Sequence, residues 1–130
     1  MSCFAKGMLG AFVFLLATAL AALVILPFYS DYRSRAAASE WLMSVGSVKI
    51  DIADNAMWLN SVLNSGVGVK TPINFPADPK VEITRDGVIL IHGKGYGQLF
   101  ALIPERSGQF IKWTCLGGSA KDVPAECRAR

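Results

Sequence analysis

The stretch GMLGAFVFLLATALAALVILPFYS, residues 7–30, decides the fold of this chain of 130 residues. It contains no charged side chain, and at a helical rise of about 1.5 Å per residue it spans roughly 36 Å. This length crosses the hydrocarbon core of a bilayer, so residues 8–30 are predicted to form a membrane-spanning helix. Residues 31–130 remain for one globular domain.

The apolar stretch also has features of a cleavable secretory signal. Lys6 precedes it, and the small residues Ala19 and Ala21 are spaced like a cleavage site. The apolar run nevertheless continues to Phe28, beyond the usual length of a signal-peptide core. We therefore favour a retained anchor and keep the cleaved signal as the alternative.

Two of the three cysteines, Cys115 and Cys127, enclose a short polar loop near the C-terminus. In an oxidising compartment such a pair favours a disulfide, which would stabilise the fold by roughly 3 kcal/mol. The alternative is two reduced cysteines in a cytosolic protein. Because a membrane segment precedes the pair, we predict the disulfide.

The charges beside the apolar run argue against placing the domain in an oxidising compartment. Lys6 lies before the run, whereas Arg33 and Arg35 follow it, and the positive-inside rule would place the domain in the cytoplasm. We give more weight to the cysteine pair and expect a periplasmic domain on an inner-membrane anchor.

The segment after the apolar run carries a helical stripe. Seven apolar residues recur at steps of three and four: Trp41, Val45, Val48, Ile52, Ala56, Leu59 and Leu63. We predict one helix from about residue 8 to residue 64, kinked or loosened at Pro27 and ended by residues 64–66. Trp41 and Trp58 are interpreted as packing residues.

The C-terminal half changes to the alternation of strands. Residues 66–79 are predicted to be a loop, Asp86-Gly87 a two-residue hairpin turn, and residues 93–97 and 104–108 further turns. The four strands between them are expected at residues 81–85, 88–91, 98–103 and 110–115. The sequence thus predicts an α+β fold, in which the long helix packs on a four-stranded antiparallel meander.

No motif in the sequence indicates catalysis, a metal or a cofactor. His92 is the only histidine and is expected to be structural or solvated. The GKGYG run, residues 93–97, lacks Walker spacing. The net charge of +3 does not require a nucleic-acid partner. Four basic residues near the C-terminus could contact the phosphates of a nucleic acid, but we interpret them as a solvated rim: Lys112, Lys121, Arg128 and Arg130.

Residues 27–35, and residues 111–115 together with 124–128, carry a further signal. These segments resemble type IVa pilins. PFYSDYRSR, residues 27–35, is similar to the pilin stretch in which a helix proline precedes Tyr, Asp, Tyr and Arg, and it includes Tyr29 and Tyr32. IKWTC, residues 111–115, with PAECR, residues 124–128, resembles the closing strand and cysteine loop of the family. The resemblance implies a pilin-like roll whose N-terminal helix assembles the subunits through Phe12, Pro27, Tyr29 and Tyr32.

The N-terminus matches the family in part. The resemblance implies a leader of residues 1–7, removed by prepilin peptidase after Gly7, with Met8 as the methylated first residue. Where pilins carry a glutamate, this chain has Phe12, and its first carboxylate is Asp31. In pilins that acid is thought to pair with the terminal amine of a neighbouring subunit, and members lacking it are typically initiating or tip subunits.

The resemblance implies a structural subunit of a bacterial surface filament, a fimbrium for adhesion, motility or DNA uptake, whose partners are other pilin subunits. Two alternatives stay open: a membrane-anchored accessory protein that does not polymerise, favoured by the missing glutamate, and a binding module secreted after cleavage near Ala19 or Ala21.

Overall fold

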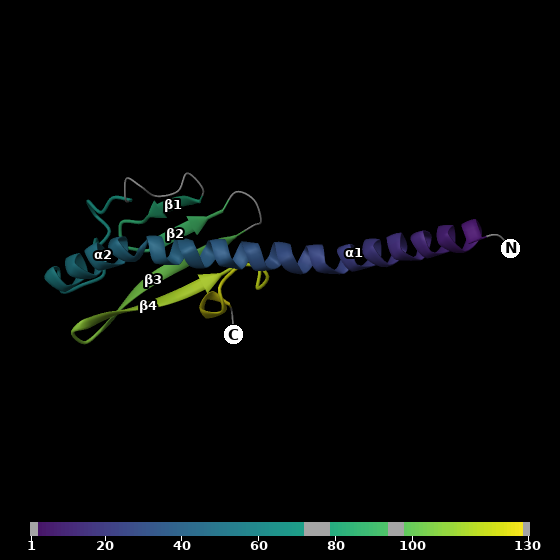
Figure 1. Ribbon diagram of the computed structural model, residues 1–130. Coiled ribbons are helices and arrows are strands. Elements are labelled where there is room, and N and C mark those ends of the chain that lie inside the picture. The colour runs from purple at the N-terminus through teal and green to yellow at the C-terminus, as the bar shows by residue number, and fades with distance from the viewer. Residues whose placement is uncertain (1–2, 72–78, 94–97, 129–130) are drawn as a thin grey trace. The chain divides into compact units, whose positions relative to one another are not determined.

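The computed structural model describes residues 3–71, 79–93 and 98–128, with side chains described for Met8 and from Gly10 onward. The chain divides into two compact units, Met1–Arg33 and Ser34–Arg130. The second unit has the α+β arrangement that the sequence predicted, with helices and a four-stranded antiparallel sheet (Figure 1).

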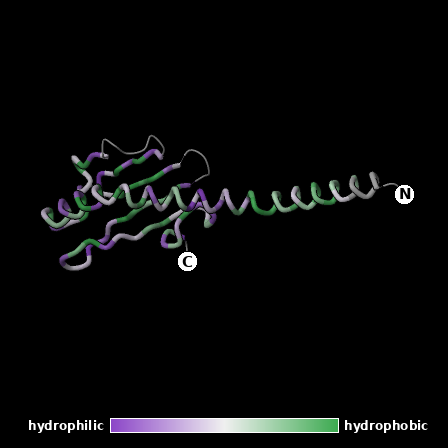
Figure 2. Tube along the Cα trace, viewed as in Figure 1, coloured by the Kyte–Doolittle hydropathy of each residue, from purple (hydrophilic) through white to green (hydrophobic). Residues whose placement is uncertain are grey.

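Helix α1, Cys3–Ser44, contains the whole apolar stretch. Figure 2 shows hydrophobic residues all along its first half. The α-helix is continuous through Pro27, so the proline does not end it. The first break falls instead at Val45, the residue before Gly46.

Helix α2, Gly46–Trp58, continues the same helical path. The Val45 N–H donates to the Trp41 carbonyl at 3.1 Å, and the Lys49 N–H donates to the Val45 carbonyl at 3.0 Å. These i to i−4 bonds carry the apolar stripe across the break. The first five stripe residues are accordingly buried, as predicted: Trp41, Val45, Val48, Ile52 and Ala56.

The predicted end of this helix is wrong, because the helix stops at Trp58 and not at residue 64. Asn60 takes a left-handed conformation with φ of 56°. Its N–H donates to the Met57 carbonyl, and the next N–H, of Ser61, reaches back to the Ala56 carbonyl at 3.0 Å. This pair of bonds is a Schellman motif, in which asparagine replaces the more usual glycine.

The early end leaves the last stripe residues outside the core. Leu59 is 40% exposed, Leu63 is 60% exposed, and Trp58 reaches 86%. The interpretation of Trp58 as a packing residue was therefore wrong, whereas Trp41 is buried as expected.

The sheet is an antiparallel meander in the order β1-β2-β3-β4, as predicted. Its strands are β1 Lys80–Ile83, β2 Ile89–His92, β3 Leu99–Ser107 and β4 Phe110–Gly117. Inward-facing partners lie opposite one another, such as Ile89 with Leu102 and Ile91 with Phe100. These side chains pack with the helical stripe into one core, where each large apolar side chain contributes about 1.5–3 kcal/mol.

The turn between β1 and β2 differs from the two-residue prediction. The Thr84 N–H donates to the Val88 carbonyl at 2.9 Å, and the Gly87 N–H donates to the Thr84 carbonyl at 3.0 Å. The loop therefore has three residues, with Gly87 at φ of 77° as in a G1 bulge. A side chain at Gly87 would also meet Ile52 at 2.6 Å.

The turn predicted at residues 104–108 is also shorter than expected. Pro104 lies within β3, opposite Trp113, and the turn consists of Gly108 and Gln109. β3 pairs with β2 only as far as Leu102. Beyond it none of the described strands pairs with this side of β3, so a proline without an N–H is tolerated there. Of the predicted loop 66–79 and turn 93–97, residues 72–78 and 94–97 lie outside the described residues.

The C-terminal segment closes one end of the core. Cys115 on β4 and Cys127 in the 3₁₀ helix η1, Ala125–Cys127, form the predicted disulfide, with their Cα atoms 4.6 Å apart. Val123 and Cys127 are fully buried within the core cluster. The cysteine loop is thus part of the domain's packing.

Candidate functional site

The first half of α1 presents its apolar surface to the outside. The large apolar side chains from Met8 to Tyr29 that the structure describes are all more than half exposed. Within the described part of the chain, one helix is long and apolar enough to cross a membrane, and its apolar window is unburied. This surface suits lipid or other apolar helices as surroundings.

The predicted assembly residues are all on this helix and all exposed. Phe12 is 65% exposed, Tyr29 59% and Tyr32 64%, and Pro27 is exposed as well. Tyr29 and Tyr32 are three residues apart and share one side of the helix, whereas Phe12 lies several turns earlier. The structure thus makes them available for contacts but does not gather them into one site.

The predicted processing residues lie in the first turns of α1. Gly7 is helical, and Met8 is 70% exposed. Phe12 stands one turn beyond Met8, and no carboxylate follows until Asp31. The described helix therefore holds no acid within the apolar stretch for a neighbouring ammonium to pair with.

A buried polar network holds the start of the domain, and sequence reasoning missed it. The Gln98 amide donates to the Ser34 carbonyl at 2.9 Å and to the Ser34 hydroxyl at 2.7 Å. That hydroxyl donates to Asp122 Oδ1 at 2.9 Å. Gln98, Phe100 and Leu102 are buried at every second position of this segment. A polar residue at a position where the alternation calls for an apolar one was the signal in the sequence. The network links α1, the sheet and the disulfide loop.

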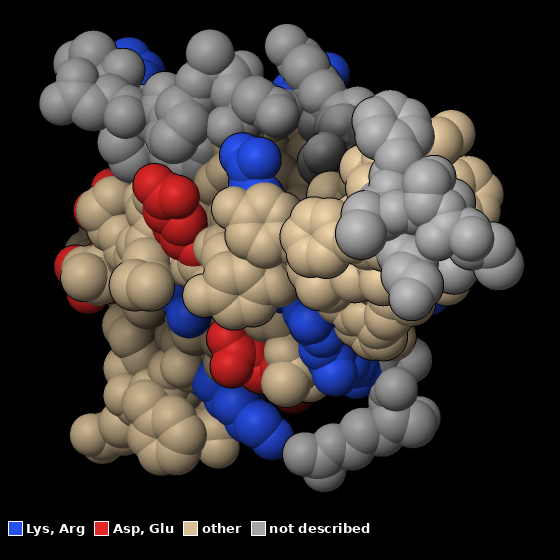
Figure 3. Space-filling view, turned by 45° about the vertical axis from the view of Figure 1, so that its right-hand side comes forward, with Lys and Arg blue, Asp and Glu red and all other residues tan. Residues whose placement is uncertain are grey.

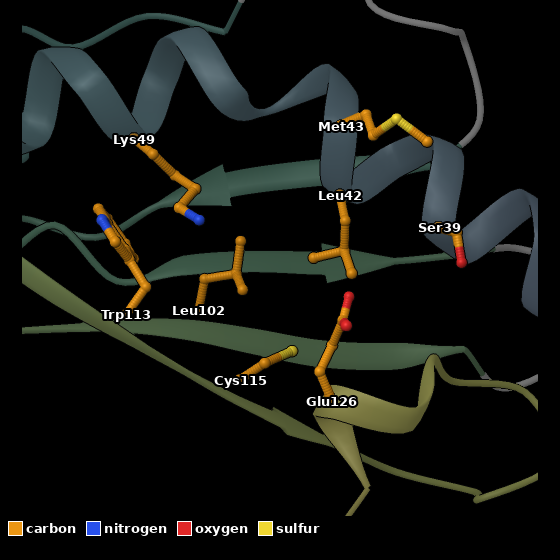
Figure 4. Close-up of a pocket in the computed structure, with 8 residues that line it drawn as sticks. All are labelled: Ser39, Leu42, Met43, Lys49, Leu102, Trp113, Cys115 and Glu126. Carbon is orange, nitrogen blue, oxygen red and sulfur yellow. The ribbon is translucent and has the colours of Figure 1, made fainter.

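A groove with a volume of about 390 Å³ opens between the helices and β4 (Figure 4). Its apolar lining comes from Leu42, Met43, Leu102, Trp113 and the disulfide at Cys115. Polar side chains lie around it: Ser39, Lys49 and Glu126. We call this feature the β4 groove.

Opposite charges occupy the β4 groove without pairing. The Lys49 ammonium lies 5.3 Å from the centre of the Trp113 ring, a cation–π distance. Glu126 rises from η1 toward Leu42 (Figure 4). Among the described residues the ion pair is Lys80 with Glu82, so neither Lys49 nor Glu126 has an ionic partner there.

The Lys80–Glu82 pair lies on the exposed face of β1, with Nζ and Oε1 2.6 Å apart. Their mutual hydrogen bond, with their Coulomb attraction, raises the pKa of Lys80 and lowers the pKa of Glu82. Because both groups are solvent-exposed, the pair contributes little to stability.

Charges of both signs lie on the surface of the domain. Figure 3 shows acidic and basic side chains on the same face. Of the C-terminal basic residues, Lys112 and Lys121 are exposed, and the Arg128 Nε donates to the Val123 carbonyl; Arg130 lies outside the described residues. In that part of the chain no three His, Cys, Asp or Glu residues form a metal-binding group, and His92 is exposed.

Comparison with known proteins finds no matching family model, no similar curated protein and no similar solved structure.

Proposed function

We propose that this chain is a type IV pilin-like structural subunit, which assembles into a bacterial surface filament through its N-terminal helix. The observation that carries the proposal is the joining of an apolar helix, exposed all round, to a compact disulfide-closed α+β domain. The resemblance of residues 27–35, and of residues 111–115 with 124–128, to pilins supports it.

The proposal has a physical reason: the exposed apolar surface of the helix is unfavourable in water. Burying apolar surface stabilises by roughly 25 cal/mol per Å², so a helix that is apolar on every side must be covered. Lipid covers it in the inner membrane before assembly, and neighbouring anchor helices cover it in a filament. In this proposal the domain faces the periplasm first, where Cys115 and Cys127 can be oxidised.

A second candidate function is a membrane-anchored accessory protein that does not polymerise. The specific observation favouring it is Phe12 at the position where pilins carry glutamate. Without that acid, the terminal ammonium of an adjoining subunit would be buried without a partner, which is costly. An initiating or tip subunit would have the same property and still belong to a filament.

The test is the mass of the mature N-terminal peptide, measured on protein produced in its native host. A methylated Met8 is expected, showing cleavage after Gly7 by prepilin peptidase. An intact Met1 would favour the accessory protein. A start after Ala19 or Ala21 would exclude both membrane proposals and indicate a secreted domain.

A further inference from the structure

An apolar surface at the end of α2 has no covering among the described residues. Trp58, Leu59, Leu63 and Val67 are 86%, 40%, 60% and 58% exposed, respectively. They belong to the segment around the Schellman turn, which we call the α2 knob. Trp58, Leu59 and Val67 line one shallow pocket, and a contiguous exposed apolar patch suits a contact surface.

The α2 knob is held in a fixed shape. The Asn55 amide donates to the Ser65 carbonyl at 3.0 Å, and the Gly66 N–H donates to the Arg85 carbonyl at 3.0 Å. The Asn64 N–H donates to Asp86 Oδ1 at 3.0 Å. These bonds tie the loop to both α2 and the hairpin. Binding of the knob would therefore cost little additional conformational entropy.

The α2 knob carries charged side chains of both signs. Asp54 lies four residues before Trp58 on the same side of α2, and it is exposed. Arg85 borders the pocket beside Trp58. The β4 groove likewise holds Lys49 and Glu126, so the two surfaces can place opposite charges against each other.

The two surfaces lie on opposite sides of α2. Lys49 and Trp58 are nine residues apart, which at about 100° per residue is roughly two and a half turns. A side chain on the groove side and one on the knob side therefore point in opposite directions. Two different surfaces on opposite sides of one domain form a heterologous contact, which propagates into open chains unless its rotation closes a ring.

We infer that the α2 knob of one copy docks into the β4 groove of a second copy of this chain. Trp58 enters over the apolar floor, Asp54 meets Lys49, and Arg85 meets Glu126. The groove volume of about 390 Å³ is in the range of about 300–1,000 Å³ that pockets use for whole ligands. The inference rests on the proposed function, since a filament supplies the second copy.

Charge reversal tests the pairing of Asp54 with Lys49. Asp54→Lys gives both surfaces a positive charge at this contact, and Lys49→Glu gives both a negative one. Each variant alone is therefore expected to lose association by about tenfold or more. In an equimolar mixture of the two variants, each positive surface can meet a negative one, so association should return. The double variant restores opposite charges within one chain and should associate as well.

The measurement is sedimentation of the full chain in detergent, which covers the apolar helix so that association reports on the domains. The expected result is a series of oligomers for the wild type, the mixture and the double variant, with monomers for each single variant. Equal association of all forms, a mixture no better than its components, or a monomeric wild type would overturn the inference. Thermal unfolding of each variant checks that it is folded.

Trp58→Ala provides an independent test, with Leu116→Ala as its control. Leu116 is 52% exposed on the outer face of the sheet, away from both surfaces. Trp58→Ala should weaken association by about tenfold or more, whereas Leu116→Ala should leave it unchanged. Unchanged self-association of Trp58→Ala would overturn the inference.

Filaments counted by electron microscopy separate this inference from the proposed function. Normal filaments from both charge variants would overturn the knob-and-groove contact alone. No filaments from the wild type in its native host would count against the proposed filament subunit, while oligomers in detergent would still support the contact.

Discussion

Residues 8–30 and residues 38–56 are both helical and rich in apolar side chains, yet they differ in what covers them. In the first region the large apolar side chains that the structure describes are 53–71% exposed. In the second region the stripe from Ala38 to Ala56 is at most 6% exposed, because the sheet covers it. The first region has apolar residues all round and depends on surroundings outside the domain, whereas the second confines them to one face.

Arginine in the first region should have the largest effect. Leu16→Arg combined with Leu20→Arg places two charges in the middle of the apolar stretch, each costing about 3 kcal/mol at the centre of a spanning helix. The chain is expected to leave the membrane fraction, as measured by alkaline extraction. Ile50→Arg, at a position 63% exposed on α2, is the control and should leave membrane association intact; equal extraction of both proteins would contradict a spanning helix.

Truncation in the second region should instead destabilise the domain. Ile52 is fully buried, so Ile52→Ala is expected to lower the free energy of unfolding by about 2–5 kcal/mol. Ile50→Ala, two residues away and mostly exposed, should change it by about 0.5 kcal/mol or less. Denaturant unfolding of the two full-length variants measures this difference, and similar losses would contradict the assigned helix face.

Removing the disulfide should cost nearly as much. Cys115→Ser opens the loop to Cys127 and is expected to lower the stability of the domain by roughly 3 kcal/mol. Limited proteolysis should then cut the C-terminal segment earlier than in the wild type. Unchanged resistance would mean that packing of Val123 holds the segment without the bond, and membrane association should not change in either case.

The smallest effect is expected at Ser65. Its hydroxyl is buried and has no hydrogen-bond partner among the described residues, and such an atom keeps its desolvation cost. Ser65→Ala should therefore leave the melting temperature unchanged or raise it by a few degrees. Asn55→Ala is the contrasting change, because it leaves the Ser65 carbonyl without its donor. A lower melting temperature for Ser65→Ala would reveal a partner for the hydroxyl.

Periodicity predicted the elements that depend on local pattern. The apolar run, the buried stripe from Trp41 to Ala56 and the four strands all follow from spacing alone. The end of α2 was misplaced because apolar residues continue at helical spacing to Leu63, while the left-handed turn at Asn60 ends the helix. Asn60 and the predicted stop at residues 64–66 lie close together in the sequence, and the helix ends at the first of them.

Features that depend on tertiary neighbours were not predictable. Pro104 was predicted as a turn residue, but β2 pairs with β3 only as far as Leu102, and none of the described strands pairs with that side of β3 beyond it. The β4 groove exists because η1 packs beside β4, bringing Glu126 to the side of the cleft opposite Lys49. No local pattern encodes that arrangement, nor the contact of Ser34 with Gln98 across 64 positions of sequence.

The polar network at Ser34 also has a mechanical consequence. Tension applied to the helix would reach the domain first at Ser34, which is hydrogen-bonded to Gln98 beside β3 and to Asp122 in the cysteine loop. A free segment with the 12-residue separation of Cys115 and Cys127 could lengthen to about 40 Å. The crosslink holds the Cα atoms at its ends 4.6 Å apart, so the loop cannot extend under load. A pulled subunit would yield elsewhere first.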